Sequence, residues 1–458
     1  MKFFRIIAAA AAVLSLMSFC PRAKDYGYVV KKGKVEFKIP ERPADQQSML
    51  GFACAPIDTV RVGFVGVGSR GTGAVKRWTH LDGVKIVAIC DKYEEQVRKN
   101  QGIVVSAGLP EPAGYWGDEG YKQLCERDDI DIVYIATSWQ MHVPVALYAM
   151  EHGKHAAIEV PAATSIEDSW KLINTAERKR LHCMMLENCC YDFFELTTLN
   201  MAQQGLLGEI VHGEGAYIHN LDPYWDAYRD DWRMQFNKDH KGDVYPTHGL
   251  GPVCQVMNIH RGDRFETLVA METAAFRGQS IADKRYGKGT VKYMNGDNTC
   301  TMIRTAKGRT ILVEHEVTIE RPYDRMYQIT GTKGYASKYP VEGFAINMNG
   351  HDAEHFASAE ELASLKEEYR HPIIDDDDFV AQAKKVGGHG GMDFIMDYRL
   401  VYCLRHGLPL DMDVYDLAEW CCLGELGRIS IENGNIPVSV PDFTRGGWNT
   451  VDGFRHAL

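Results

Sequence analysis

The sequence predicts an α/β N-terminal domain built on a parallel sheet, followed by an α+β domain with a mainly antiparallel sheet. Its 458 residues give each of two domains room for its own core. In the first part of the chain, short apolar β-rich runs alternate with helical segments, which is typical of parallel strands covered by helices. After about residue 205 the pattern changes to strands that follow one another directly, which favours antiparallel pairing.

Five apolar runs define the predicted parallel sheet. The first covers residues 60–65 and stops at a group of glycines, and the second covers residues 84–90 and ends at Asp91. A helical stretch at residues 72–80 separates these two strands. The other three strands are predicted at residues 132–136, 155–159 and 182–186, with a helix at residues 165–180 before the last one.

In the second domain, the clearest signal is a hairpin at residues 299–317 that turns at Lys307-Gly308. Further strands are expected at residues 268–271 and 327–330, with helices on one side of the sheet. We therefore divide the chain into a leader at residues 1–20, an extended arm or linker at 21–58, the parallel-sheet domain at 59–190 and the α+β domain at 191–458.

The first 20 residues have the layout of a secretory signal. Lys2 and Arg5 precede an apolar stretch at residues 6–19, and this part of the chain contains no acidic residue. The apolar stretch is too short to span a bilayer comfortably. We expect an exported protein, at the cell surface or in the periplasm. Export without a lipid and anchoring through a lipid on Cys20 are both open.

Composition excludes some classes of function. The formal net charge of −11 argues against nucleic acid as a partner, because a nucleic-acid-binding surface must be basic. The twelve cysteines include no Cys-x-x-Cys pair, and several lie inside apolar runs. We interpret them mainly as buried small hydrophobic residues and predict no metal site.

The glycine group after the first strand has the pattern of a dinucleotide-binding turn. Gly66 allows the tight turn, Gly68 lets a pyrophosphate approach the backbone, and Gly71 allows the following helix to pack closely on the strand. Asp91 ends the next strand twenty residues after Gly71, where a carboxylate accepts hydrogen bonds from the adenosine ribose and repels a 2′-phosphate. This pattern favours NAD over NADP as the cofactor of a Rossmann domain. The alternative is a glycine turn that only reverses the direction of the chain. The predicted cofactor-binding residues here are Gly66, Gly68, Ser69, Arg70 and Gly71, with Asp91; Arg70 is the one that would soften the preference for NAD.

Several motifs that follow resemble the Gfo/Idh/MocA oxidoreductases. They are Ile135-Ala136-Thr137, His142, Glu151-His152-Gly153-Lys154-His155 and Glu159-Val160-Pro161. The resemblance implies that Thr137, His142 and Glu159 contact the cofactor. Val160 stands where that family usually has a lysine on which many sugar dehydrogenases depend. This departure weighs against an ordinary sugar or polyol dehydrogenase.

Longer motifs resemble glycoside hydrolase family 109, the NAD-dependent α-N-acetylgalactosaminidases, from about Val60 to the C-terminal region. These motifs are Glu187-Asn188-Cys189-Cys190-Tyr191, Asp231-Trp232-Arg233, Tyr245-Pro246-Thr247-His248-Gly249-Leu250-Gly251-Pro252, Arg321-Pro322-Tyr323 and Gly387-Gly388-His389-Gly390-Gly391-Met392-Asp393. The resemblance implies a glycan substrate and hydrolysis of terminal α-linked N-acetylgalactosamine. We also expect a homo-oligomer.

Such an enzyme cleaves the glycosidic bond by a redox route, whereas most glycosidases use two flanking carboxylates. Hydride passes from C3 of the sugar to NAD, which gives a 3-keto sugar with an acidified C2 proton. A base removes that proton and the C1 substituent leaves by elimination. Water then adds at C1 and the hydride returns to C3. Because the cofactor is regenerated in each turnover, it is expected to stay bound.

The resemblance also implies a role for each site residue. His248 is expected to act as the base on the C3 hydroxyl, since imidazole titrates near neutral pH, and Tyr191 to remove the C2 proton. A phenol is a poor base at neutral pH and needs a nearby cation or hydrogen-bond donors. Glu159, Arg233, Tyr245 and Tyr323 match substrate-contacting positions, and His389 is expected to line the nicotinamide or sugar site.

Each role has a structural alternative. His248 would be a core histidine, Tyr191 an interface residue and Glu159 a solvated strand-end carboxylate, while Arg233 would form a surface ion pair with Asp230 or Asp231. Two other functions stay open besides the glycosidase. One is an NAD-dependent sugar or polyol oxidoreductase that releases NADH, and the other is a sugar-binding protein with a vestigial cofactor.

Overall fold

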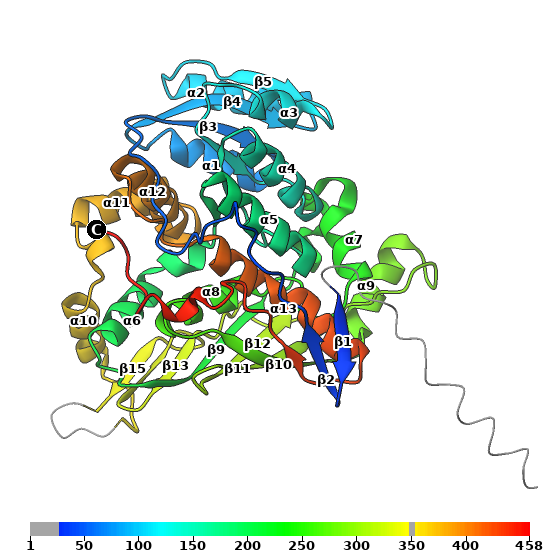
Figure 1. The fold of residues 1–458 in the computed structure, drawn as a ribbon, viewed down its shortest axis with the longest axis vertical. Coiled ribbons are helices and arrows are strands. Elements are labelled where there is room, and N and C mark those ends of the chain that lie inside the picture. The colour runs from blue at the N-terminus through cyan, green and yellow to red at the C-terminus, as the bar shows by residue number, and fades with distance from the viewer. Residues whose placement is uncertain (1–26, 348–352) are drawn as a thin grey trace, which may run out of the picture.

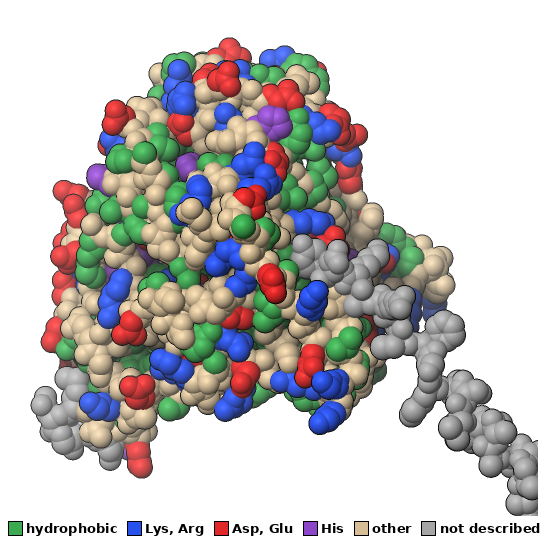
Figure 2. Space-filling model, in the orientation of Figure 1, with side chains coloured by type: hydrophobic (Ala, Val, Ile, Leu, Met, Phe, Trp, Pro, Cys, Tyr) green, Lys and Arg blue, Asp and Glu red, His purple; other side chains and the backbone are tan. Residues whose placement is uncertain are grey.

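The computed structural model describes residues 27–347 and 353–458, and it contains two sheets that lie at opposite ends of the view in Figure 1. The predicted leader and Cys20 lie outside the described residues. Within the described part of the chain, no helix is long and apolar enough to cross a membrane. Acidic and basic side chains are interspersed over the face shown in Figure 2.

The first sheet has six parallel strands in the order β5-β4-β3-β6-β7-β8. The strands are β3 (Val60–Val65), β4 (Val84–Asp91), β5 (Ala113–Trp116), β6 (Ile132–Ile135), β7 (His155–Ile158) and β8 (Cys183–Met185). The helices are α1 (Ser69–Trp78), α2 (Glu94–Ser106), α3 (Gly120–Cys125), α4 (Trp139–Glu151) and α5 (Ile166–Lys179). This doubly wound order reverses direction between β3 and β6, and ligands bind at the carboxyl ends of the strands at such a switch point.

Five of these strands confirm the sequence prediction, and β5 is the one that it missed. Its sequence, Ala-Gly-Tyr-Trp, is short, contains a glycine and lacks β-branched residues. Pairing with β4, which places Trp116 beside Asp91, therefore determines this strand more than local propensity does.

The second sheet has ten strands in the order β1-β2-β16-β10-β11-β12-β9-β13-β14-β15, and most of its pairs are antiparallel. The parallel pairs are β9 with β12 and β2 with β16. Strands from the second domain are β9 (Ile210–Ile218), β10 (Phe265–Glu272), β11 (Thr299–Thr305), β12 (Thr310–Glu316), β13 (Gln328–Gly331), β14 (Gly334–Ser337), β15 (Gly343–Ile346) and β16 (Val438–Ser439). The predicted hairpin at residues 299–317 is confirmed as β11 and β12.

The segment predicted as an extended arm contributes a hairpin to the second sheet. Strands β1 (Tyr28–Lys31) and β2 (Lys34–Phe37) are joined by Lys32 and Gly33, both with positive φ, as a tight hairpin turn requires. Val35 of β2 pairs with Val438 of β16, so residues that precede the parallel-sheet domain in the chain extend the sheet of the other domain. The Lys32-Gly33 turn between two short β-rich runs is the signal that could have revealed this hairpin.

The remaining helices belong to the second domain. They are α6 (Phe193–Gln203), α7 (Trp232–Asp239), α8 (Thr247–Val256), α9 (Phe276–Tyr286), α10 (Ala359–Glu368), α11 (Asp377–Val386), α12 (Met392–His406) and α13 (Val414–Glu432), with short 3₁₀ turns that include η1 (Asn188–Tyr191), η2 (Asp222–Ala227), η3 (Arg229–Asp231) and η5 (His389–Gly391). Helix α13 packs between β10 and α5, and α12 packs against α1 and η1 (Figure 1). Residues from the last quarter of the chain therefore reach the carboxyl edge of the first sheet.

Candidate functional site

The glycine turn between β3 and α1 has the geometry that a dinucleotide needs. Gly66 has φ +85°, and a Cβ there would lie 2.6 Å from the backbone of Ala136. A Cβ on Gly71 would lie 2.0 Å from the carbonyl oxygen of Gly66, so the helix packs directly on the turn. A Cβ on Gly68 would meet no atom within 4 Å, and no side chain caps the start of α1 at Ser69. The turn thus presents free backbone N–H groups to open space, which fits a pyrophosphate.

Asp91 is fixed at the edge of this turn. Its Oδ2 accepts the N–H of Val67 at 2.8 Å and its Oδ1 accepts the N–H of Tyr93 at 3.0 Å. Burial raises the pKa of Asp91, although these two donors oppose the shift. The carboxylate therefore lies where the ribose of a dinucleotide is bound, as the sequence predicts.

Arg70 has a different task from the one predicted for it. Its Nε donates to Glu159 Oε1 at 2.7 Å and its Nη1 donates to Asp393 Oδ2 at 2.6 Å. Both carboxylates are nearly buried, and Asp393 belongs to α12 of the second domain. Arg70 is thus held on the β7 side of the sheet and joins the two domains. It does not lie beside Asp91, where it would favour a 2′-phosphate.

His389 and Glu159 join the same group of charges. His389 Nδ1 lies 3.0 Å from Asp393 Oδ2 and 3.4 Å from Arg70 Nη1, and 60% of its side chain is exposed. Glu159 Oε1 also accepts the hydroxyl of Tyr134 at 3.1 Å. The predicted site residues Arg70, Glu159 and His389 therefore lie together at the switch point of the sheet. The exposed His389 imidazole lies beside the Arg70 guanidinium, which is paired with two carboxylates.

Thr137 and His142 shape the loop after β6. The backbone of Thr137 approaches Gly66, as a cofactor-lining loop should. His142 is buried, and its Nδ1 lies 2.9 Å from the carbonyl oxygen of Pro161 while its Nε2 lies 3.1 Å from that of Thr137. Because the ring is buried and both of its nitrogens face backbone carbonyl oxygens, His142 joins the two loops and leaves no ring nitrogen for the cofactor. This corrects the predicted contact.

His248 lies in the first turn of α8 and forms a pair with Glu187. Its Nδ1 lies 2.7 Å from Glu187 Oε1, and its Nε2 lies 3.4 Å from the hydroxyl of Tyr245. Burial raises the pKa of Glu187, but His248 outweighs it and the pKa is lowered. An ionised carboxylate only accepts hydrogen bonds, so Nδ1 carries a proton, and in the neutral imidazole Nε2 is the proton acceptor. The alternative of an inert core histidine does not describe this arrangement.

The glycines around His248 allow α8 to lie very close to its neighbours. A Cβ on Gly249 would lie 2.5 Å from the backbone nitrogen of Ala216 in β9. A Cβ on Gly251 would lie 2.8 Å from the Glu187 side chain. These two glycines therefore let the helix approach both β9 and Glu187, and the Thr-His-Gly-Leu-Gly motif specifies the His248–Glu187 contact.

Arg233 is surrounded by aromatic rings. Its guanidinium carbon lies 4.9 Å from the ring centre of Tyr245 and 5.1 Å from that of Trp139, which belongs to α4 of the cofactor domain. Its Nη2 lies 3.4 Å from the hydroxyl of Tyr217 in β9. Arg233 is buried, and its Nε has no hydrogen-bond partner among the described residues. The alternative of a surface ion pair with Asp230 or Asp231 is therefore excluded.

Tyr217 and His219 were not predicted as site residues. The Tyr217 hydroxyl lies 3.0 Å from His219 Nδ1, and the exposed ring of Tyr323 packs edge-on against His219 with ring centres 5.1 Å apart. Burial lowers the pKa of His219 to about 4, with help from Arg233, His248 and His389. His219 therefore lies against Tyr323 and close enough to Arg233, His248 and His389 for their charges to affect it. The alternation Tyr217-x-His219 on one face of a strand is the signal that could have shown it.

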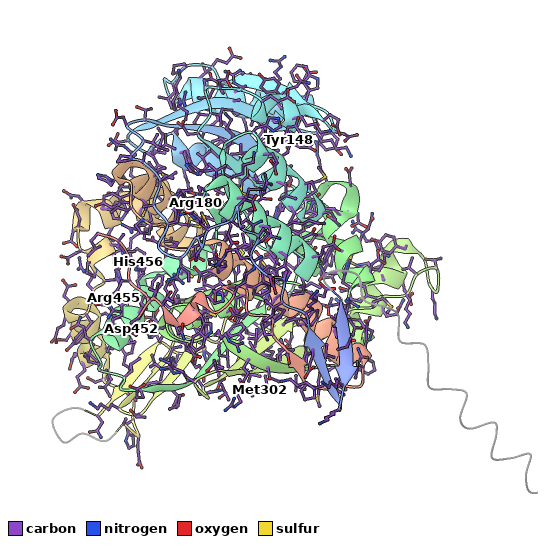
Figure 3. All side chains as sticks on the ribbon, viewed as in Figure 1. Tyr148, Arg180, Met302, Asp452, Arg455 and His456 are labelled. Atoms are coloured by element: carbon purple, nitrogen blue, oxygen red, sulfur yellow. The ribbon has the colours of Figure 1, made fainter. Side chains whose placement is uncertain are left out.

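Tyr191 is not part of this group. Its side chain is fully buried, and its hydroxyl donates to Asp411 at 3.1 Å. Asp411 also accepts two bonds from Arg399, and the Tyr191 ring lies near His456 of the C-terminal segment, which is labelled in Figure 3. Burial and the Asp411 charge raise the pKa of Tyr191 well above its usual range. A buried phenol that donates to a carboxylate is not placed to remove a substrate proton, which corrects the predicted role.

Two cavities lie away from this group of side chains. One of about 340 Å³ is lined by the N-terminal arm, Asp411 and residues 451–455, and one of about 660 Å³ lies between α6, α10 and α11. Neither contains Glu159, Glu187 or His248. The chemistry of the side chains, and not the size of a cavity, therefore identifies the site.

Among the residues that the structure describes, one set of side chains has the spacing of metal ligands. Ligand atoms of Glu187, Cys189 and His248 lie within 4.8 Å of one another. Arg325 Nη1, however, lies 2.7 Å from the Cys189 sulfur, and burial raises the pKa of that thiol well above its usual range. A guanidinium and a protonated thiol both oppose a bound cation. The cysteines in the described ranges are free thiols.

Comparisons with known proteins cover nearly the whole chain. Residues 60–187 match the oxidoreductase family with an NAD-binding Rossmann fold, and residues 191–450 match the C-terminal domain of glycosyl hydrolase 109. A glycosyl hydrolase family 109 protein of Bacteroides thetaiotaomicron is 57% identical over 93% of this chain and 94% of its own length. One from Phocaeicola vulgatus is 55% identical over 97% of both chains.

Solved structures share the fold at low sequence identity. A levoglucosan dehydrogenase in complex with NADH and levoglucosan has a TM-score of 0.65 at 17% identity, covering 84% of this chain and all of its own. The myo-inositol dehydrogenase of Lactobacillus casei, in complex with NAD(H) and myo-inositol, has a TM-score of 0.57 at 16% identity and covers 84% of this chain and 99% of its own. With the glycine turn, Asp91 and the two family matches together, the chain belongs to glycosyl hydrolase family 109 and has NAD as its cofactor.

Proposed function

We propose that this protein hydrolyses terminal α-linked N-acetylgalactosamine by a transient oxidation of the sugar at C3. The observation that carries the proposal is the His248–Glu187 pair, which leaves a proton-accepting Nε2 within the group of Tyr245, Arg233 and His219. This group adjoins the NAD-binding domain through Trp139, which stacks on Tyr245 with ring centres 5.6 Å apart.

His248 takes the proton of the C3 hydroxyl at Nε2, and Glu187 stabilises the imidazolium that forms. When bound, NAD supplies a reversible hydride acceptor. Arg233 holds the sugar, because its Nε is buried without a partner among the described residues and so requires a polar ligand. A ketone at C3 withdraws electrons and makes the proton on the neighbouring C2 acidic. The site therefore needs a second proton acceptor, which removes this proton.

We assign the removal of the C2 proton to Tyr217 instead of Tyr191. Its hydroxyl lies 3.4 Å from the Arg233 guanidinium and 3.0 Å from a neutral His219 imidazole. Burial raises the pKa of Tyr217, but the Arg233 guanidinium opposes the shift and stabilises the phenolate, which is the form that accepts the C2 proton. The C2–H electron pair then forms the C1–C2 double bond, and the aglycone oxygen leaves with the C1–O pair and takes a proton from water.

Regeneration of the cofactor in each turnover suits an exported enzyme. An enzyme that recovers NAD in every turnover needs no free pool of the cofactor outside the cell. We propose that the protein works in the periplasm or at the cell surface with its NAD bound.

The test is a panel of nitrophenyl glycosides assayed with the NAD-loaded protein and with protein stripped of NAD. We expect nitrophenol release from the α-N-acetylgalactosaminide only when NAD is present, without net accumulation of NADH. A steady rise in NADH absorbance with free sugar and added NAD would instead identify a sugar oxidoreductase. Sugar binding without cleavage of any glycoside, after NAD is restored, would identify a binding protein.

A further inference from the structure

A short segment of the second domain, residues 228–231, crosses to the cofactor domain beside Asp91. Arg229 Nη1 donates to Glu95 Oε1 at 2.6 Å, and its guanidinium lies over the Tyr93 ring, 4.4 Å from the ring centre. Asp230 accepts the Tyr93 hydroxyl at 2.6 Å and the ammonium of Lys92 at 3.1 Å. We call residues 228–231 the strap.

The strap is anchored on its other side. Asp231 Oδ1 pairs with Arg285 at 2.8 Å, and its Oδ2 accepts the hydroxyl of Tyr286, so α9 holds it from behind. Asp230 and Asp231 both have φ +56°, a left-handed conformation that is uncommon except for glycine, asparagine and aspartate. The strap is therefore held across the domain boundary by contacts on both sides.

The contacted residues lie at the adenosine end of the NAD site. Lys92 and Tyr93 directly follow Asp91 at the carboxyl end of β4, and the backbone N–H of Tyr93 holds the Asp91 carboxylate. Arg229 is close enough to lower the pKa of Asp91 against the effect of burial. A dinucleotide whose ribose is bound by Asp91 lies under this boundary.

We propose that the strap closes the adenosine end of the NAD site, and that Arg229 and Asp230 set the rate at which the cofactor leaves. Release then requires the contacts to Lys92, Tyr93 and Glu95 to break together. Each is exposed and weak alone, but all three oppose the same motion. The inference depends on NAD binding and not on the proposed glycosidase activity.

The test measures exchange of bound NAD. Protein loaded with NAD is mixed with excess isotopically labelled NAD, and the label that stays bound after gel filtration is followed over time by mass spectrometry. We compare wild type with the double variant Tyr93→Phe/Asp230→Asn and with Arg229→Ala. Asparagine tolerates the positive φ, so the backbone of the strap is kept. Arg178→Ala is the matched control, because it removes an ion pair to Glu151 of similar exposure within the cofactor domain.

We expect NAD exchange about tenfold faster in the double variant and in Arg229→Ala, as for a few exposed interactions lost together, with the control at the wild-type rate. Raising salt from about 0.05 to about 0.5 M should speed exchange in wild type and have less effect in the double variant, because exposed ion pairs are screened. Exchange within about twofold of wild type in both variants, with unchanged melting temperatures, would overturn the proposal.

Discussion

Glu187, Asn188 and Tyr191 belong to one short motif, but their side chains contact different parts of the molecule. Glu187 binds His248, Asn188 donates to Asp393, and Tyr191 donates to Asp411. Sequence identifies the motif but not these directions, which is why Tyr191 was given a role in the site and Glu187 was given none.

Tyr191→Phe tests this correction. The variant loses a buried hydrogen bond to a carboxylate, so we expect the free energy of unfolding to fall by about 2 kcal/mol. Activity should stay within about threefold of wild type, because the hydroxyl does not touch the His248 group. Chemical denaturation and glycosidase kinetics check the two parts. A loss of activity of about 100-fold at unchanged stability would restore the catalytic role of Tyr191.

Glu187→Gln tests the pair with His248. A glutamine amide can present an N–H to Nδ1 and so favour the tautomer in which Nε2 no longer accepts a proton. We expect kcat to fall by about 100-fold with unchanged NAD content. Glu209→Gln, which changes an exposed carboxylate, is the control for the loss of a charge. Activity of Glu187→Gln at the level of that control would show that the pair does not assist proton transfer.

At the scale of elements, each glycine of the turn between β3 and α1 could be predicted from the sequence, because the local backbone geometry of the turn requires a glycine at that position. The β1–β2 hairpin and β5 were missed for the opposite reason. Their strands are short, and pairing with β16 and β4 determines them. Local pattern is thus sufficient for a βαβ unit, whereas strands at the edge of a sheet depend on partners that are distant in the chain.

Substitution of Gly68 should affect NAD binding, whereas substitution of Gly71 should affect the stability of the fold. A Cβ on Gly68 enters open space in front of α1, so Gly68→Ala should weaken NAD binding by at least about tenfold and leave the melting temperature unchanged. A Cβ on Gly71 would overlap the Gly66 carbonyl, so Gly71→Ala should lower the melting temperature. Calorimetric titration with NAD and thermal unfolding measure both. Normal NAD binding by Gly68→Ala would contradict the assigned position of the pyrophosphate.

At the scale of the whole molecule, the two domains are joined by buried charges that no local pattern reveals. Arg70 pairs with Asp393, and Arg77 pairs with Asp397, across more than 300 residues of sequence. The fold class and the NAD site could be predicted because they depend on repeated local signals. The partners of Arg70 could not, because they depend on the return of α12 to the first domain.

Another group of buried charges, Asp192 with Lys338 and Arg325, predicts the response of the protein to acid. Burial alone would raise the pKa of Asp192, but Lys338 and Arg325 lower it to about 2. A carboxyl with a lowered folded-state pKa stabilises the fold above its unfolded pKa, and this contribution is lost as the pH falls toward the folded value. Asp192 should therefore contribute about 2 kcal/mol that disappears between about pH 4 and pH 2.

Asp243 acts in the opposite direction, because burial raises its pKa to about 7, so its protonation stabilises the fold as the pH falls from about 7 to 4. Stability should pass through a maximum between these ranges. Denaturant titrations from about pH 8 to 2 measure it, and Asp192→Asn should flatten the acid limb while Asp243→Asn flattens the rise. An acid limb unchanged in Asp192→Asn would contradict the assignment.

The central claim is that the glycosidic bond breaks by loss of the C2 proton, and hydrolysis in D₂O tests it most directly. Released N-acetylgalactosamine is analysed for deuterium at C2 by NMR. The account predicts one solvent deuterium at C2 in product made by wild type, and a parallel loss of exchange and cleavage in Tyr217→Phe. Complete hydrolysis that leaves C2 free of deuterium would contradict the claim.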